Sequence, residues 1–240
     1  MSPTFAPASE RVLGPGEYLL GAAVLALTLG ALAFAAVRLR RALVPAWSGS
    51  PALVVDVVLV LALALLLGEL LGTFELFTRW GYLAGALVVA ALAPWAAGEV
   101  ARRTTPGGAP PAPPHARYAM PIVAVVVALV FAGWAIPTLT GIAGGMGRAD
   151  SLWYHMPLSA RFLQTGDTWG YNFFDPIFFA HFYPANSELW HAIPLLAFER
   201  DFVSPVLNLG FLALSLLACW AIGRPYGVAP QALLGWAVVL

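Results

Sequence analysis

The sequence predicts an all-α fold: a polytopic transmembrane helix bundle with an external loop of short amphipathic surface helices. The chain is 60% hydrophobic and only 10% charged, with a mean hydropathy of +0.81, whereas soluble domains carry about 25% charged residues. Its apolar residues fall into runs of about 20, the number that an α-helix needs to cross a hydrocarbon core ~30 Å thick. One polar and aromatic stretch, residues 148–200, interrupts these runs and holds three of the four histidines. We therefore expect the function to lie in this loop.

The overall composition narrows the class of protein. The formal net charge of +0 gives no indication of a nucleic-acid partner. The single Cys219 lies in an apolar run, which excludes a disulfide framework within the chain. All twelve basic residues are arginine, and with the abundant Ala, Leu, Gly and Pro this favours a GC-rich bacterial genome. The composition thus predicts a multi-pass protein of a bacterial cell membrane.

Three transmembrane helices are expected first, and arginines set their orientation. Arg38, Arg40 and Arg41 directly follow the first helix, and Arg102 and Arg103 follow the third. Clustered basic residues at a helix end mark the cytoplasmic side, so the first helix runs from outside to inside and the N-terminus is external. The first run lacks a basic segment before it and is long enough to span, so we interpret it as a retained helix. The three expected helices cover residues 17–37, 51–71 and 80–97.

Two acidic residues lie within the second helix, Asp56 near its inner end and Glu69 near its outer end. An ionisable group inside a membrane span is by default a candidate functional site. Neither residue is at the midplane, and a side chain near a helix end can reach headgroups or water. We therefore favour this structural interpretation for both.

A Pro/Gly/Ala segment divides the chain. Residues 104–115 (TTPGGAPPAPPH) read as a semi-rigid linker without a core. The sequence therefore predicts an N-terminal three-helix transmembrane unit at residues 1–103, a linker at 104–118 and a second unit at 119–240.

The second unit is expected to hold two complete spans with the polar loop between them. Residues 120–139 form the fourth span, and Arg117 before it places its start inside, so the loop at residues 141–202 is external. Residues 204–222 form the fifth span. The last apolar run, residues 231–240, has about ten residues, too few for a span. We expect the sequence to be a fragment that stops within a sixth helix.

Two short helices are expected in the loop, at residues 150–165 and 187–198. Pro157 lacks an amide donor and should kink the first helix or start its second half, and Gly166 should stop it. An amphipathic helix of this kind is expected to lie along the membrane surface. At α-helical spacing, one face of it carries Leu152, Met156, Ser159 and Leu163.

Asp150 opens the first of these helices, directly after a span. A carboxylate there could act as a general base that takes the proton of an acceptor hydroxyl. On local grounds the role of N-cap, for which Asp is strongly preferred, is favoured, and the two roles are compatible. Arg148 and Arg161 could pair with phosphate; in a continuous helix Arg161 lies on the same face as Asp150, about 16 Å along the axis. Anchoring to lipid headgroups accounts equally well for both arginines.

Tyr154 and His155 are the next candidates. His155 could hold a substrate hydroxyl or a phosphate, although a hydrogen-bonded histidine at the membrane interface is the more common case. No metal site is expected, because His155, His181 and His191 are widely spaced and no His-x-x-x-His or Cys cluster is present. No cofactor is expected either.

The last candidates lie in the second short helix. Glu188 and His191 are three residues apart and share a helix face. They could bind a sugar, with Tyr183 or Trp190 as a stacking platform. The structural alternative makes Ser187 the helix cap, with Glu188 in the first turn, where it suits the helix dipole.

The order of these features carries a resemblance. A transmembrane helix is followed by Asp150, then Tyr154-His155, then Ala160-Arg-Phe-Leu-Gln-Thr-Gly166, an aromatic loop, and Tyr183-Pro-Ala-Asn-Ser-Glu188. This order resembles the first external loop of GT-C glycosyltransferases, polytopic enzymes that use polyprenyl-phosphate-linked sugars and include protein mannosyltransferases and aminoarabinose transferases. The resemblance covers roughly residues 119–225. Two departures are that many relatives have Asp-Glu where this chain has Asp150-Ser151, and that three helices here precede the matching span.

The resemblance implies a function and a base. In that family an acidic residue of this loop is the catalytic base, and Asp150 is at the matching position. The implied donor is a polyprenyl-phosphate-linked sugar that enters sideways from the outer leaflet of the bilayer. The implied acceptor is a hydroxyl of a glycan, lipid or protein, and transfer inverts the anomeric carbon while arginines hold the leaving phosphate.

A protein of another class remains an alternative: a non-catalytic transporter, part of a flippase, or an assembly subunit. Transporters place polar residues and broken helices near the midplane of the membrane. Here the polar residues gather in the loop, which favours the enzyme. A catalytically inactive partner of such an enzyme is a second alternative.

Overall fold

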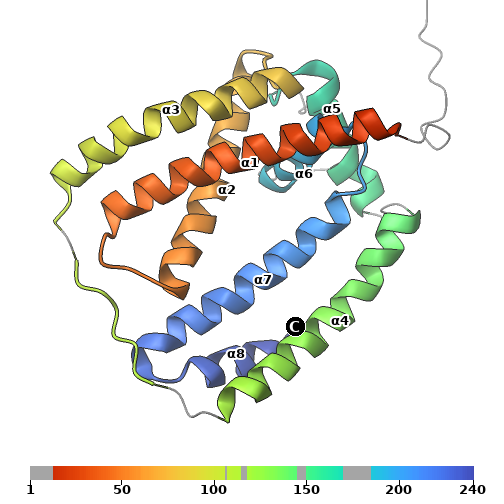
Figure 1. Ribbon diagram of the computed structural model, residues 1–240. Helices are drawn as coiled ribbons and strands as arrows, with labels where there is room; N and C mark the ends of the chain where they lie inside the picture. Colours follow the sequence, from red (N-terminus) through yellow and green to blue (C-terminus); the bar gives the residue numbers. More distant parts are fainter. Residues whose placement is uncertain (1–12, 106, 115–117, 145–149, 170–184) are drawn as a thin grey trace, which may run out of the picture.

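The structure is a computed structural model, which describes residues 13–105, 107–114, 118–144, 150–169 and 185–240. Within these ranges the regular secondary structure is helical, and no strand is present. Figure 1 shows long helices that cross one another, with shorter helices packed near their ends. The predicted all-α class is therefore confirmed.

Five of the described helices are long and apolar enough to cross a membrane. Each extends a predicted span by a few residues, because the polar residues at the ends of the apolar runs continue the helix. α8 (Ala229–Ala237) has nine residues and follows the last of the five. The five long helices are α1 (Pro15–Leu43), α2 (Ser50–Thr73), α3 (Arg79–Arg103), α4 (Ala119–Gly144) and α7 (Ser204–Gly223).

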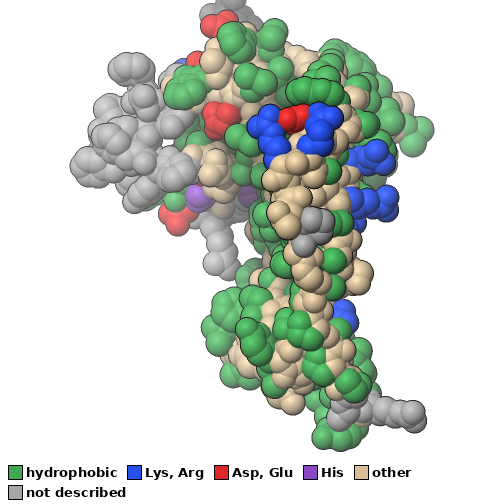
Figure 2. All heavy atoms as spheres, turned by 90° about the vertical axis from the view of Figure 1, so that its left-hand side faces the viewer, with side chains coloured by type: hydrophobic (Ala, Val, Ile, Leu, Met, Phe, Trp, Pro, Cys, Tyr) green, Lys and Arg blue, Asp and Glu red, His purple; other side chains and the backbone are tan. Residues whose placement is uncertain are grey.

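The two ends of this bundle differ in chemistry. α1 and α3 lie side by side and run in the same direction, and α2 runs back across both (Figure 1). We call the end where α2 stops and α3 starts the loop side, because α5 (Met156–Thr165) and α6 (Asn186–Phe198) pack there. The other end, the arginine side, holds Arg40 and Arg41 in the last turn of α1 and Arg102 and Arg103 in the last turn of α3. Figure 2 looks onto this end, where arginine side chains gather.

Small residues let the first three helices approach closely. Several alanines of α1 and α3 are buried, and Ala35 and Ala86 are fully enclosed. Small side chains are the usual contact residues between membrane helices. The Tyr82 hydroxyl of α3 donates a hydrogen bond of 2.7 Å to the carbonyl oxygen of Ala64 in α2. This bond satisfies a polar group in an apolar core.

The two acidic residues of α2 bind other parts of the chain. Arg40 Nε donates to Asp56 Oδ1 at 2.9 Å, so Asp56 is held in an ion pair between α1 and α2 rather than reaching headgroups. Glu69 Oε2 accepts a bond of 3.3 Å from Thr168 Oγ1 on the loop side. A pairing partner is what an acidic group in an apolar bundle requires.

α6 is inserted into the loop side of the bundle. Its residues from Ala192 to Phe198 are all buried. Two glycines make room for it: a Cβ at Gly68 of α2 would lie 2.9 Å from Leu189 Cδ2, and a Cβ at Gly21 of α1 would lie 2.5 Å from the Phe198 ring. These contacts connect the two units predicted from the sequence. The described residues between those units, 104–105 and 107–114, lie outside helices, and the division into units stays a prediction.

Candidate functional site

The first loop helix begins with one wide turn. η1 (Ser151–His155) is a π-helical turn, in which the Met156 N–H donates to the Ser151 carbonyl oxygen, and α5 follows it. Pro157 stands in the first turn of α5; it has no N–H, so the ordinary α-helical bond is lost at this point. The prediction that Pro157 starts a second half is confirmed. Gly166 ends α5 with φ +70°, as expected of a glycine stop.

Asp150 stands at the start of this turn and is exposed. Its own backbone is α-helical (φ −63°, ψ −37°), and its side chain makes no capping hydrogen bond. The N-cap interpretation of Asp150 is therefore wrong, because a cap needs an extended backbone that turns the carboxylate back towards the first N–H groups. An uncommitted carboxylate at a helix end is consistent with the alternative role of base, which stays a prediction.

His155 and Glu188 meet across 33 residues of sequence. His155 Nδ1 contacts Glu188 Oε1, which joins the π turn to the first turn of α6. The Glu188 side chain is 5% exposed and the His155 side chain 33% exposed. A buried carboxylate is thus paired with an imidazole that still reaches the surface.

Two serines complete this junction. Ser187 Oγ donates to Glu188 Oε2 at 2.8 Å. Ser159 Oγ lies 2.8 Å from the main-chain carbonyl oxygens of both His155 and Glu188. The predicted cap role of Ser187 is wrong: Ala185 precedes the helix, no side chain caps it, and the Ser187 hydroxyl is used by Glu188.

His191 lies one turn beyond Glu188 on the same helix. Its Nδ1 is buried and has no hydrogen-bond partner within the described part of the chain. Burial lowers the pKa of His191, the Glu188 carboxylate raises it and His155 lowers it further. Trp190, proposed as a stacking platform, instead packs edge-on against Phe211 of α7, with ring centroids 6.4 Å apart.

Tyr154 covers one face of this junction, and its ring centroid lies 4.0 Å from that of His155. Arg161 is half-buried in α5. The π turn inserts an extra residue into the helical register, so the expectation that Arg161 shares a face with Asp150 in one continuous α-helix is not met. Arg148 and Tyr183 lie outside the described residues.

The same register change alters the apolar face of the helix. Leu152, expected on the same face as Ser159, is 62% exposed, whereas Ser159 is fully buried. The side chains that are buried on α5 are Leu158, Ser159 and Phe162. A strict 3.6-residue period fails here because the first turn is not an α turn.

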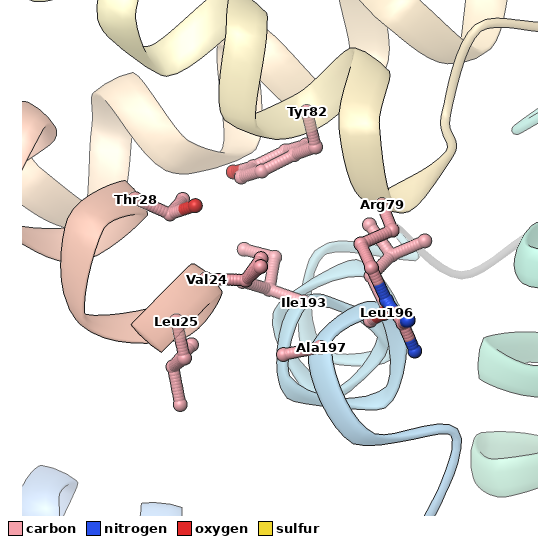
Figure 3. A pocket seen from close by; sticks show the side chains of 8 residues that line it. All are labelled: Val24, Leu25, Thr28, Arg79, Tyr82, Ile193, Leu196 and Ala197. Carbon is pink, nitrogen blue, oxygen red and sulfur yellow. Dashed lines mark hydrogen bonds between the residues drawn. The ribbon is translucent and has the colours of Figure 1, made fainter. Parts of the chain in front are cut away.

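The far side of α6 has a small pocket, which sequence reasoning did not anticipate. Figure 3 shows it between α1, α3 and α6, with Arg79 alongside Leu196. Arg79 Nε donates to the Leu196 carbonyl oxygen at 2.8 Å and Arg79 Nη2 to Glu199 Oε1 at 2.9 Å. Arg79 therefore satisfies the C-terminal end of α6. The pocket has room for about one water molecule, so it serves packing rather than ligand binding.

A metal site requires several ligand side chains close together. Among the described residues, no group of three or more His, Cys, Asp and Glu side chains is arranged to hold a metal ion. The site is a hydrogen-bonded pair, His155 and Glu188, with Tyr154 and His191 beside it and Asp150 at the start of the same π turn.

Comparison of the chain with protein-family models, with curated proteins and with solved structures finds no match.

Proposed function

We propose that the protein is a membrane glycosyltransferase of the GT-C type. It transfers a sugar from a polyprenyl-phosphate donor to an acceptor hydroxyl on the external face, with inversion at the anomeric carbon. Asp150 is the proposed base, and the partners are the lipid-linked donor, a glycan, lipid or protein acceptor, and the bilayer.

The observation that carries this proposal is the contact between His155 and Glu188. His155 belongs to the Tyr-His piece of the resemblance and Glu188 ends the Tyr-Pro-x-x-x-Glu piece. The resemblance rests on the order of short pieces, each of them weak. Their meeting at one junction, with Asp150 at the start of the same turn, supports the view that they belong to one site.

The surroundings of the junction suit a donor held in lipid. Leu152, Trp153 and Trp169 are more than half exposed on the loop side. Exposed apolar and tryptophan side chains of this kind favour the membrane–water interface. The arginine side lies at the other end of the helices. It fits the cytoplasmic face by the positive-inside rule, which supports an external position for the junction.

In the proposed reaction, the acceptor oxygen attacks the anomeric carbon and the bond from that carbon to the phosphate oxygen breaks. Asp150 accepts the hydroxyl proton, and the polyprenyl phosphate leaves with the bonding electron pair. An exposed carboxylate that spends no hydrogen bond on capping is free to accept this proton. Arg148 and Arg161 are the proposed partners of the leaving phosphate.

The test is the variant Asp150→Asn in the full-length protein, with sugar transfer from a polyprenyl-phosphate donor measured in membranes. We expect transfer to fall by at least about 100-fold, because general base catalysis typically contributes 10²–10⁴. Asp201→Asn, the same change at another acidic residue of the loop, is the matched control and should transfer at the wild-type rate. Wild-type turnover in Asp150→Asn would refute the base assignment. A wild-type protein that works equally well in donor-depleted membranes would refute the whole class and favour the transporter or assembly subunit.

A further inference from the structure

The junction described above contains a buried carboxylate with two partners that point to its oxygens. Ser187 Oγ donates to Oε2 of Glu188, and His155 Nδ1 contacts Oε1. An ionised carboxylate only accepts hydrogen bonds, so the proton at the His155 contact belongs to Nδ1. Glu188 also lies in the first turn of α6, where the helix dipole favours a negative charge.

This arrangement fixes what the other ring nitrogen can do. When the Nδ1 of a histidine is held by a carboxylate, the ring is oriented and Nε2 is left for another partner. The His155 side chain is one-third exposed although Glu188 is buried. Nε2, the ring nitrogen that Glu188 does not contact, is therefore the one that can meet a ligand.

The π turn brings His155 nearer to the side of the helix on which Asp150 stands. In a π turn the hydrogen bond runs from residue i+5 to residue i, as it does here from Met156 to Ser151, and His155 follows Asp150 by the same five residues. In an α-helix, a separation of five residues would place the two side chains on different faces. This short segment therefore carries two groups of opposite use: a carboxylate that accepts a proton, and an imidazole that donates from both ring nitrogens when it is protonated.

We infer that His155 binds the phosphate of the lipid-linked donor as the imidazolium: Nδ1–H donates to Glu188, which positions the ring, and Nε2–H donates to the phosphate. This inference rests on the proposed function and adds to it a residue for the phosphate. As the anomeric C–O bond breaks, the phosphodiester monoanion becomes a monoester with one more negative charge. His155 donates a hydrogen bond to that oxygen and keeps its proton, while Asp150 takes the proton of the acceptor hydroxyl, so the charges balance.

The experiment compares two ligands that differ only in the phosphate. Binding of a polyprenyl phosphate and of the unphosphorylated polyprenol is measured to the full-length protein in nanodiscs, by competition with labelled donor. We expect His155→Gln to lose the preference for phosphate by about tenfold or more, the usual effect of one hydrogen bond to a charged group. Glu188→Gln should lose part of that preference, because the ring remains but is no longer held.

Glu199→Gln is the matched control for Glu188→Gln, since it makes the same change at the other end of α6. Glu199 is exposed and its carboxylate pairs with Arg79, away from His155, so its variant should keep the wild-type preference. In kinetics, His155→Gln should raise KM for the donor and lower kcat without changing KM for the acceptor. If His155 had a purely structural role, its substitution would weaken the binding of polyprenyl phosphate and of polyprenol alike.

A measurement on the wild-type protein guards against variants that fail to fold. Carbethoxylation of His155, followed by mass spectrometry, should be slowed by polyprenyl phosphate and not by polyprenol. The inference is overturned if the wild-type protein transfers sugar but His155→Gln keeps the phosphate preference, or if both ligands protect His155 equally. A wild-type protein that neither transfers sugar nor prefers the phosphate would instead overturn the proposed function.

Discussion

The Ser159 hydroxyl on α5 donates a hydrogen bond of 2.8 Å to the main-chain carbonyl oxygen of Glu188 on α6. The Ser159 side chain is fully buried. The bond fixes α5 against α6 next to the contact between His155 and Glu188. Ser159 therefore connects α5 to α6, and this connection does not use the His155 imidazole.

Ser159→Ala should lower the stability of the loop side by about 1–2 kcal/mol, because it removes a buried hydrogen bond and leaves a carbonyl oxygen without it. Thermal unfolding in detergent is the measurement, and a fall of a few degrees in the midpoint is expected. Ser187→Ala is the control, because Ser187 belongs to the same junction but is exposed. Its unfolding midpoint should fall less. Equal effects of the two substitutions would contradict this account.

Gly166→Ala should be more damaging than a glycine substitution elsewhere with the same backbone angle. At φ +70° an Ala costs about 1–2 kcal/mol, and at Gly166 a Cβ would also lie 2.6 Å from the carbonyl oxygen of Glu75. Gly227 has the same φ of +70°, but its Cβ would face only the Pro113 ring at 3.2 Å. Gly227→Ala should therefore be destabilised by the backbone strain and not by a clash with a carbonyl oxygen. The unfolding midpoints of the two variants are measured side by side, and Gly166→Ala should show the larger fall.

The spans and the helix ends were predictable from the sequence, since they depend on local properties. Runs of apolar residues located the five long helices, and Pro157 and Gly166 marked the start and end of α5. Their effect is carried by the missing N–H of proline and the free φ of glycine, which act wherever the residue stands.

The pairing within the site was not predictable in the same way. Glu188 was grouped with His191 because the two share a helix face, yet its carboxylate binds His155, 33 residues away in sequence. Helical periodicity relates residues three or four apart and says nothing about which helix lies opposite. The π turn was likewise missed, because the sequence pattern was compared with the α-helical period alone.

Arg40 and Asp56 give a test of the packing between α1 and α2. Their side chains are only 11% and 18% exposed and pair at 2.9 Å. Arg40→Leu should destabilise the protein by about 2–3 kcal/mol, because it leaves a largely buried carboxylate unpaired. The double variant Arg40→Leu/Asp56→Leu should recover most of that loss. Unfolding in a denaturant series is measured for the wild type, for Arg40→Leu and Asp56→Leu alone and for the double variant, and additive effects of the two substitutions would show that the ion pair contributes nothing.

His191 should make stability depend on pH in one direction. Its pKa in the folded protein is lowered from the ordinary value of 6.5, mainly by burial. Below that value the unfolded chain binds a proton that the folded chain takes up less readily, so stability falls as the pH falls. Above it, both states are neutral at this residue and it contributes no pH dependence.

The measurement is the unfolding midpoint at about pH 7.5 and about pH 5.5, on the two sides of the ordinary histidine pKa. His191→Gln should show a smaller drop on acidification than the wild type, because Gln does not titrate. His115→Gln makes the same chemical change in the predicted linker and should leave the drop as it is in the wild type. His155 and Glu188, the charged groups that act on His191, are intact in both variants. A wild-type drop in His191→Gln would therefore mean that the acid sensitivity arises at another residue.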